Sequence, residues 1–188
     1  MIPIADEMMA QMTPSENHNA AMYGDDTASS VQPGEALLLH GLVRALRPKI
    51  IREIGSGYGF STLHLATACR DNGIGKVYSS ETNATRRAVA QEWIDRAGLT
   101  AWVEFKRDYS PFPYQIDLLF LDAVHTTAAV TGYIQALLNR LNDNVVIAIH
   151  DPNFDNHVAL AVQSLGLDDW QALYFPETSV GGLAILRR

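Results

Sequence analysis

Two pairs of polar side chains in this sequence have the chemistry of general bases and metal ligands. Asp122 and His125 follow one apolar segment, and His150 and Asp151 end another. An imidazole titrates near neutral pH, and a carboxylate can hold a divalent cation. These residue types allow a proton-transfer site, a metal site or both. They also allow a plain structural role, with His150 bonded at the edge of the core and Asp151 capping a helix.

A glycine-rich segment, GSGYGFST at residues 55–62, follows a short β-branched run. Glycines at the end of a strand let the backbone turn sharply and approach a ligand closely. Glu81 ends the next predicted strand, where a carboxylate can accept both hydroxyl protons of a ribose. Phe60 stands where the dinucleotide fingerprint has its third glycine, which disfavours a pyrophosphate ligand. The alternative is a tight turn without a ligand, with Glu81 capping the following helix.

Strand and helix patterns alternate along most of the chain. The predicted strands are 49–54, 76–80, 102–105, 116–121, 145–149, 170–175 and 183–186. The predicted helices run from about residue 34 to before Pro48, and over 60–69, 85–97, 127–141 and 158–165. Such alternation predicts an α/β fold with a mostly parallel sheet covered on both faces. The last two strands, joined through Pro176 and a glycine pair, predict an antiparallel hairpin at one edge.

Size and composition indicate one globular domain. The chain has 188 residues, of which 47% are hydrophobic and 19% charged. We expect residues 1–33 to form an arm or cap over the active site and residues 34–188 to form the domain itself. The net charge of −7, without clustered Lys or Arg, argues against nucleic-acid binding. A single cysteine, Cys69, and no sign of a signal peptide or membrane span predict a cytoplasmic protein.

The ordered set of motifs resembles that of class I S-adenosylmethionine (SAM)-dependent O-methyltransferases. The motifs are EIGSGYGFST at 53–62, Glu81, DLLFLDAVH at 117–125 and IHD at 149–151. The nearest branch contains the catechol and caffeoyl-CoA enzymes and related bacterial small-molecule methyltransferases. The resemblance runs from about Val31 to the C-terminus and implies a Rossmann-like, doubly wound, seven-stranded sheet.

The resemblance also implies a cofactor site. It places five residues around the methionine and ribose parts of SAM: Glu53, Gly55, Ser56, Gly57 and Ser61. In the same way Glu81 would hold the ribose, Asp108 would contact the adenine, and Asp122 would border the cofactor.

The strand order of the family brings the ends of the fourth and fifth strands together. Asp122 and His125 would then meet His150 and Asp151, and we expect Asp122, His125 and His150 to take part in catalysis. His125 is the preferred general base, because it aligns with the lysine base of catechol-type enzymes. Asp122 and Asp151 are the candidate ligands of Mg²⁺ or another divalent ion. Pro152 departs from the metal-dependent pattern, which has asparagine after the strand-five aspartate.

The expected function is SAM-dependent methylation of a small-molecule acceptor, with oxygen favoured as the methylated atom. Neither nucleic acid nor membrane is expected as a partner, and a homodimer is compatible with the Met-rich arm. Two alternatives remain: an NAD-dependent oxidoreductase, which would share the sheet and glycine turn, and a non-catalytic SAM-binding or interaction protein.

Overall fold

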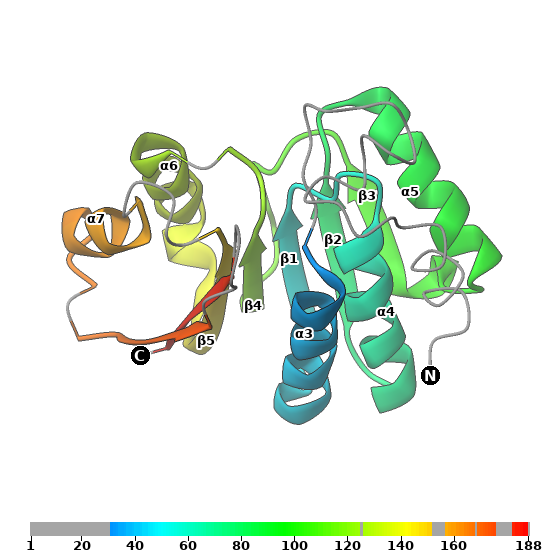
Figure 1. Cartoon of the computed structure of the whole chain (residues 1–188), viewed down its shortest axis with the longest axis horizontal. Coiled ribbons are helices and arrows are strands. Elements are labelled where there is room, and N and C mark those ends of the chain that lie inside the picture. The colour runs from blue at the N-terminus through cyan, green and yellow to red at the C-terminus, as the bar shows by residue number, and fades with distance from the viewer. Residues whose placement is uncertain (1–30, 125, 152–156, 168, 176–181, 188) are drawn as a thin grey trace.

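One mixed sheet organises the part of the chain that the structure describes. The computed structural model describes residues 31–187, apart from 125, 152–156, 168 and 176–181. The strands are β1 (Ile50–Ile54), β2 (Lys76–Ser80), β3 (Val103–Lys106), β4 (Ile116–Leu121), β5 (Leu141–His150), β6 (Gln171–Phe175) and β7 (Leu183–Arg187). They form a sheet in the order β3-β2-β1-β4-β5-β7-β6 (Figure 1).

The first five strands run parallel, and the last two run against them. β1 pairs in parallel with both β2 and β4, and β4 pairs in parallel with β5. β7 lies antiparallel between β5 and the edge strand β6. This confirms the predicted α/β class and the antiparallel terminal hairpin. The chain reverses its direction of winding between β1 and β4, which is the point at which open α/β sheets bind ligands.

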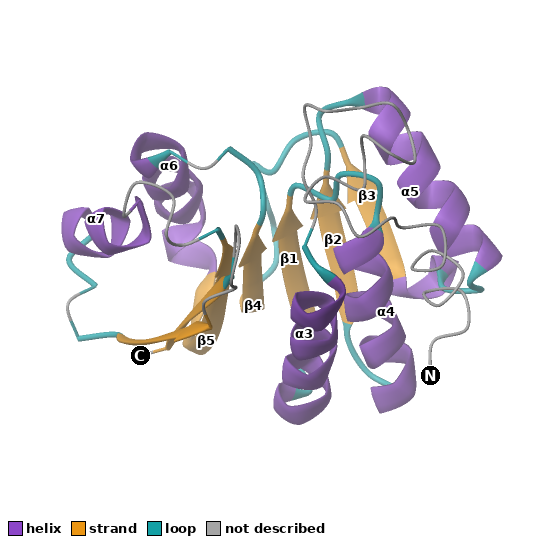
Figure 2. Cartoon of the chain, in the orientation of Figure 1, coloured by secondary structure: helices purple, strands orange, loops and turns teal. Residues whose placement is uncertain are grey.

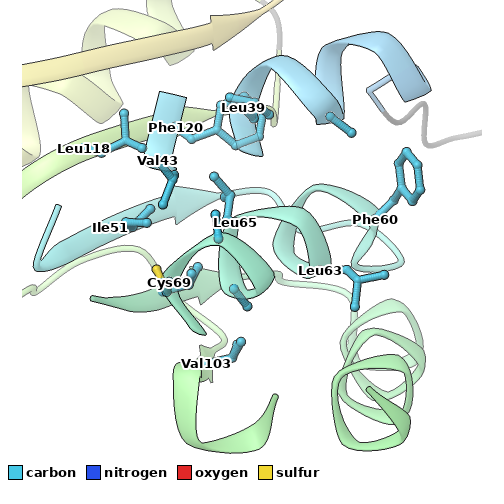
Figure 3. Close-up of a cluster of buried hydrophobic side chains, with 14 of the residues drawn as sticks. Leu39, Val43, Ile51, Phe60, Leu63, Leu65, Cys69, Val103, Leu118 and Phe120 are labelled. Carbon is cyan, nitrogen blue, oxygen red and sulfur yellow. The ribbon is translucent and has the colours of Figure 1, made fainter. Parts of the chain in front are cut away.

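Helices cover both faces of the sheet (Figure 2). The helices α3 (Pro33–Leu46), α4 (Phe60–Asn72) and α5 (Ala84–Arg96) contribute to one buried cluster, and α6 (Thr127–Leu137) and α7 (His157–Ser164) contribute to the other. In the first cluster, Leu39 and Val43 of α3 pack with Leu65 of α4 over Ile51 of β1 (Figure 3). Strand residues alternate between the two clusters, so burial on both faces fixes the register of each strand.

Some element boundaries differ from the sequence-based expectation. The helix predicted over 127–141 ends at Leu137 and continues as a single 3₁₀ turn, Leu138–Arg140. β5 then begins at Leu141, four residues before the predicted start. The prediction missed these residues because the polar side chains of Asn142 to Asn144 resemble those of a turn. Trp102, predicted in a strand, closes the 3₁₀ turn Thr100–Trp102.

The arm over residues 1–30 lies outside the described residues. Within the described part, α3 begins at Pro33. Proline suits the first turn of a helix, because the backbone N–H that it lacks would have no partner within the helix there. The Glu35 carboxylate accepts a hydrogen bond from the Gln32 backbone N–H at 2.7 Å, which closes the start of this helix. None of the described helices has both the length and the apolar character that crossing a membrane requires.

Candidate functional site

The carboxyl ends of the central parallel strands meet at one edge of the sheet. Ile54 at the end of β1 is level with Ser80 of β2 and Leu121 of β4, and Leu121 is level with Ile149 of β5. The residues that follow these strands therefore share this edge, as the parallel arrows in Figure 1 show. This edge therefore carries residues from the ends of four strands: the glycine segment after β1, Glu81 after β2, Asp122 after β4 and His150 at the end of β5.

The glycine segment is tied to both neighbouring strands. Gly55, Gly57 and Gly59 all have a positive φ, which glycine adopts without steric cost. The Gly55 N–H donates to the Ser80 carbonyl at 2.9 Å, and the Gly57 N–H donates to the Glu81 carboxylate at 3.0 Å. A methyl group on Gly55 would lie 1.9 Å from the Asp122 carbonyl oxygen. The segment is therefore held in a fixed conformation against β2 and the end of β4.

Glu53, expected near the cofactor, lies wholly inside the protein beneath the glycine segment. Its carboxylate accepts hydrogen bonds from the hydroxyls of Ser61 and Thr62 at 2.6 Å each, and of Ser79 at 2.5 Å. Burial raises the pKa of Glu53, the three hydroxyl donors oppose that rise, and the charge on Asp122 adds to it. In this arrangement Glu53 and Ser61 bond to each other and brace the start of α4.

Ser56 and Glu81 offer polar atoms at the glycine segment. The Ser56 hydroxyl is buried and has no hydrogen-bond partner among the described residues. A buried hydroxyl without a partner costs about 1–3 kcal/mol. The Glu81 carboxylate is 3.0 Å from the Gly57 N–H and 2.8 Å from the Asn83 N–H, each through a different oxygen. Each oxygen of a carboxylate has two acceptor sites, so one remains on each beside these bonds.

Arg52 is a buried residue of this edge that the sequence analysis did not single out. Its guanidinium donates to the backbone carbonyls of Glu53 at 3.0 Å, Tyr78 at 2.5 Å and Asp108 at 3.3 Å. It also lies over the Phe112 ring, 5.1 Å from the ring centre. Burial lowers the pKa of Arg52 to about 10, partly offset by the charge on Glu53. Arg52 thus fixes the backbone of Asp108, whose own side chain is 69% exposed.

A cluster of charged residues occupies the other half of the edge. His150 Nδ1 lies 3.0 Å from Asp122 Oδ1 and 3.5 Å from Asp151 Oδ2. The opposite ring nitrogen, Nε2, lies 3.0 Å from Glu35 Oε2. Glu35 comes from α3, and its other oxygen accepts the Gly182 N–H at 2.7 Å. The sequence analysis missed Glu35, because 115 residues separate it from His150.

Burial and neighbouring charges act in opposite directions on His150. Burial opposes the charged ring, but the charges on Asp122 and Asp151 and the hydrogen bonds with Asp122 and Glu35 outweigh it. The pKa of His150 therefore lies well above its ordinary value. The structure brings Asp122, His150 and Asp151 together as expected, while His125, the preferred base, lies outside the described residues.

The expected binding of a divalent ion by Asp122 and Asp151 stays a prediction. Within the described ranges, no three His, Cys, Asp or Glu side chains are grouped so that they could hold a metal ion. Magnesium needs carboxylate oxygens directed at a common point about 2.0–2.1 Å away. One oxygen of each carboxylate, Asp122 Oδ1 and Asp151 Oδ2, lies near Nδ1 of His150.

A hollow of about 560 Å³ lies at the opposite edge of the sheet, where the strands begin. Lys49, Asp117 and Asn142 are among its lining residues. The Asp117 carboxylate is already bonded there to the backbone of Lys49 and to the Asn142 amide. This hollow is separate from the edge that holds the glycine segment.

Comparisons with known proteins agree with this architecture. A catechol O-methyltransferase of Niastella koreensis is 34% identical over 105 residues, which cover 51% of this chain and 47% of that protein. The chain thus spans about half the length of this curated relative.

Solved structures share the fold over nearly the whole chain. The O-methyltransferase of Bacillus cereus in complex with S-adenosylhomocysteine (SAH) has a TM-score of 0.72 at 20% identity, covering 99% of this chain and 91% of that one. An O-methyltransferase of Streptomyces achromogenes in complex with SAM has a TM-score of 0.72 at 16% identity, covering 98% of this chain and 95% of that one. At these identities the likeness shows a shared Rossmann-like methyltransferase fold.

A family model described as a methyltransferase domain matches residues 52–152. The match runs from Arg52 in β1, through the glycine segment, to the residue after Asp151. It therefore contains the glycine segment together with Asp122, His150 and Asp151, and the chain belongs to the methyltransferase domain family.

Proposed function

We propose that this chain transfers a methyl group from SAM to a small-molecule acceptor, most simply to a hydroxyl oxygen. The observation that carries the proposal is the glycine segment of a methyltransferase-family chain, in which the buried hydroxyl of Ser56 has no hydrogen-bond partner among the described residues. The printed names of the relatives, which include a catechol O-methyltransferase, support oxygen as the acceptor atom.

The residues at the glycine segment fit SAM in their polar chemistry. The Ser56 hydroxyl would gain a partner from a polar group of the ligand, which removes the cost of its burial. Among the described residues each Glu81 oxygen accepts one backbone hydrogen bond, and the remaining acceptor site on each suits one of the two hydroxyl donors of a ribose. Gly55 and Gly57 have positive φ values, which allow the sharp backbone turn that a cofactor-binding segment of this kind needs. The expected contacts of Glu53, Asp108 and Asp122 with SAM remain predictions.

The chain must orient the acceptor and take up one proton. When bound, SAM supplies a methyl group on a positively charged sulfur, which makes that group open to in-line attack. As the acceptor oxygen bonds to the methyl carbon, the carbon–sulfur bond would break and SAH would leave. The hydroxyl of the acceptor would lose its proton in this step, and we assign that proton to His125. An imidazole with a pKa near neutrality accepts a proton without a large shift. General base catalysis of this kind is worth about 10²–10⁴-fold in rate.

We place the protein in the cytoplasm, with a small molecule as its substrate. The single cysteine, Cys69, is buried as a free thiol and cannot form a disulfide within the chain. The net charge of −7 also makes nucleic acid an unfavourable partner.

Calorimetric titration of the full chain with SAM, SAH and NAD tests the cofactor. We expect SAM and SAH to bind and NAD not to bind. Glu81→Ala should weaken SAM binding at least about tenfold, the equivalent of 1.4 kcal/mol. Glu92→Ala is a matched control, because Glu92 lies exposed on α5. Binding of NAD without SAM would instead support the oxidoreductase alternative.

Methyl transfer from labelled SAM to a panel of catechols tests the base. His125→Asn should leave the affinity for SAM unchanged. It should lower the turnover of any catechol that the wild-type protein methylates by about 10²–10⁴-fold. Full turnover in this variant would exclude His125 as the base. SAM binding without transfer to any hydroxyl compound would favour the non-catalytic alternative.

A further inference from the structure

The hollow at the edge of the sheet opposite the glycine segment has no part in the proposed function. Its volume is about 560 Å³. It lies where β1, β4 and β5 begin and where α3 and β7 end, at the tails of the β1 and β4 arrows in Figure 1. Pockets that bind small molecules usually measure about 300–1,000 Å³, so this hollow has the size that a small organic ligand needs.

Three cationic side chains line the hollow: Arg47 after α3, Lys49 before β1 and Arg187 at the end of β7. All three residues are exposed, and none of them forms an ion pair with another of the described residues. The Arg47 guanidinium is held by the side chain and the carbonyl of Asn72, at 3.5 and 3.1 Å. In a chain with a net charge of −7, this local excess of positive charge favours an anionic ligand.

Among the described lining residues, Asp117 is the one acid, and its carboxylate already has partners. Its Oδ2 accepts the backbone N–H groups of Lys49 and Ile50 at 2.8 and 2.9 Å, and its Oδ1 accepts the Asn142 amide at 2.6 Å. These bonds hold in place the backbone that carries Lys49. The hollow therefore keeps its positive charge and is formed before any ligand binds.

The polar start of β5 adds hydrogen-bond donors to the same hollow. Asn142, Asn144 and Val146 all line it, because alternate residues of a strand lie on one face. Arg187 of β7 pairs with Val146 in the antiparallel register. Side chains paired in this way share a face, with their Cβ atoms about 4.5–5.5 Å apart. The guanidinium of Arg187 and the amides of β5 are thus on the same side of the sheet.

Leu46 and Tyr114 give the hollow an apolar side. Leu46 is 36% exposed and Tyr114 45% exposed, and both are lining residues. The Tyr114 ring is supported by two other rings, with its centre 4.9 Å from that of Tyr78 and 5.6 Å from that of Phe112. An aromatic group of a ligand gains by packing against a ring held in this way.

We propose that this hollow binds an aromatic phosphate monoester. Lys49 and Arg187 bind the phosphate group, Arg47 adds to the attractive field, and Tyr114 packs against the aromatic ring. Three cations and one carboxylate leave an excess of two positive charges in the lining. A phosphate monoester carries about −1.5 to −2 charges at pH 7, which matches this excess better than a carboxylate does. The inference does not rest on the proposed function, because it concerns the opposite edge of the sheet.

Calorimetric titration of the full chain with phenyl phosphate at low salt tests the inference. We expect one site per chain with a dissociation constant below about 1 mM. Benzoate has the ring but one charge, and inorganic phosphate has the charge but no ring, so each should bind at least about threefold more weakly. No binding of phenyl phosphate at millimolar concentrations would overturn the inference. Equal affinity for benzoate would overturn the choice of phosphate, and equal affinity for inorganic phosphate would overturn the choice of an aromatic ester.

The double variant Lys49→Met with Arg187→Gln removes both charges that bind the phosphate. It should weaken the binding of phenyl phosphate at least about tenfold. The matched control is Lys106→Met with Arg96→Gln, because both of these residues are exposed and neither lines the hollow. The control should change the affinity by less than about twofold, since distant exposed charges are screened.

Equal losses in the two double variants would overturn the inference, because net charge and not the hollow would then attract the anion. Tyr114→Ala should weaken the binding of phenyl phosphate and leave that of inorganic phosphate unchanged. An unchanged affinity of this variant for phenyl phosphate would contradict the role of the ring. Circular dichroism establishes that each variant is folded.

SAH separates this inference from the proposed function. Saturating SAH should leave the affinity for phenyl phosphate unchanged, because the two ligands bind at opposite edges of the sheet. Competition between them would place the phosphate ester at the glycine segment and overturn the inference. If SAH does not bind, the proposed function fails, and the variants of Lys49, Arg187 and Tyr114 still decide the inference.

Discussion

The two halves of the sheet edge hold their buried carboxylates by different means. Under the glycine segment, Glu53 is surrounded by the neutral hydroxyls of Ser61, Thr62 and Ser79. Beyond β4, Asp122 and Glu35 are held by the charged ring of His150. The hydroxyls come from α4 and β2, which are close in sequence to β1, whereas the charged cluster joins residues up to 115 positions apart.

The two halves therefore differ in how strongly their hydrogen bonds depend on charge. Hydroxyl donors satisfy Glu53 at any charge state, because a hydroxyl can rotate to donate or accept. The His150 cluster depends on charge, and removing His150 takes a hydrogen-bond partner from both Asp122 and Glu35. We therefore expect the hydrogen bonds of Glu53 to persist when its charge changes, and the contacts of the charged half to depend on charge.

The largest effect is expected where the two halves touch. Gly55→Ala places a methyl group 1.9 Å from the Asp122 carbonyl, at a residue with a φ of 89°. Backbone cannot yield as a side chain can, so both halves must move apart. We expect the free energy of unfolding to fall by about 3 kcal/mol and SAM binding to be lost. Urea denaturation and calorimetry measure the two effects.

Gly98→Ala is the control for this change. Gly98 also has a positive φ, 66°, but nothing lies within 4 Å of an added methyl group. The backbone cost alone is about 1 kcal/mol, and SAM affinity should not change. Equal effects of the two substitutions would show that the contact between the halves is unimportant.

The pH dependence of stability distinguishes the two halves next. Burial raises the pKa of Glu53 in the folded protein above 4.5, the value at which the unfolded chain releases this proton. The contribution of Glu53 to stability is therefore complete below pH 4.5 and is lost as the pH rises through the pKa that Glu53 has in the folded protein. The pKa of His150 is also raised, so its contribution is complete below pH 6.5 and is lost as the pH rises through its folded value. The carboxylates of Glu35, Asp122 and Asp151 face that ring.

Glu53→Gln tests this pH dependence, because it removes the titration of Glu53 and leaves that of His150. Each group can change the free energy of unfolding by at most about 1.4 kcal/mol per pH unit. We expect the variant to lose the decline that begins near pH 4.5 and to keep the decline that begins above pH 6.5. Urea denaturation at a series of pH values measures both. An unchanged slope near pH 5 would mean that Glu53 titrates normally.

The two halves also differ in how far the sequence predicts them. Glycines after a β-branched run carry a local signal, and the predicted glycine turn before α4, Glu81 after β2 and the mostly parallel sheet are confirmed as structure. The roles of these residues toward SAM stay predictions.

Long-range contacts have no such signal. Glu35 occurs in a pattern typical of any helix start, and only the folded chain places it against His150. The early start of β5 was missed because Asn142, Asp143 and Asn144 are polar and resemble a turn. Arg52 lies between Ile51 and Glu53 in a buried strand, and its hydrogen bonds go to the carbonyls of Tyr78 in β2 and of Asp108, two residues after β3.

The smallest effect is expected at Arg52, which supports the glycine half from the opposite face of the sheet. One ammonium group cannot span the carbonyls of Glu53, Tyr78 and Asp108 as the guanidinium does. We expect Arg52→Lys to lower the free energy of unfolding by about 1–2 kcal/mol, because a buried carbonyl loses its donor. SAM affinity should fall severalfold, because the Asp108 backbone is released.

Arg96→Lys is the matched control for Arg52→Lys. Arg96 is an exposed arginine at the end of α5, 4.5 Å from the Trp93 ring centre. The same exchange at this surface position should cost less than about 0.5 kcal/mol and leave SAM affinity unchanged. If Arg52→Lys lowered stability alone, Arg52 would support only the fold. A joint loss of stability and SAM affinity would place the Asp108 backbone at the cofactor and extend the glycine half to β3.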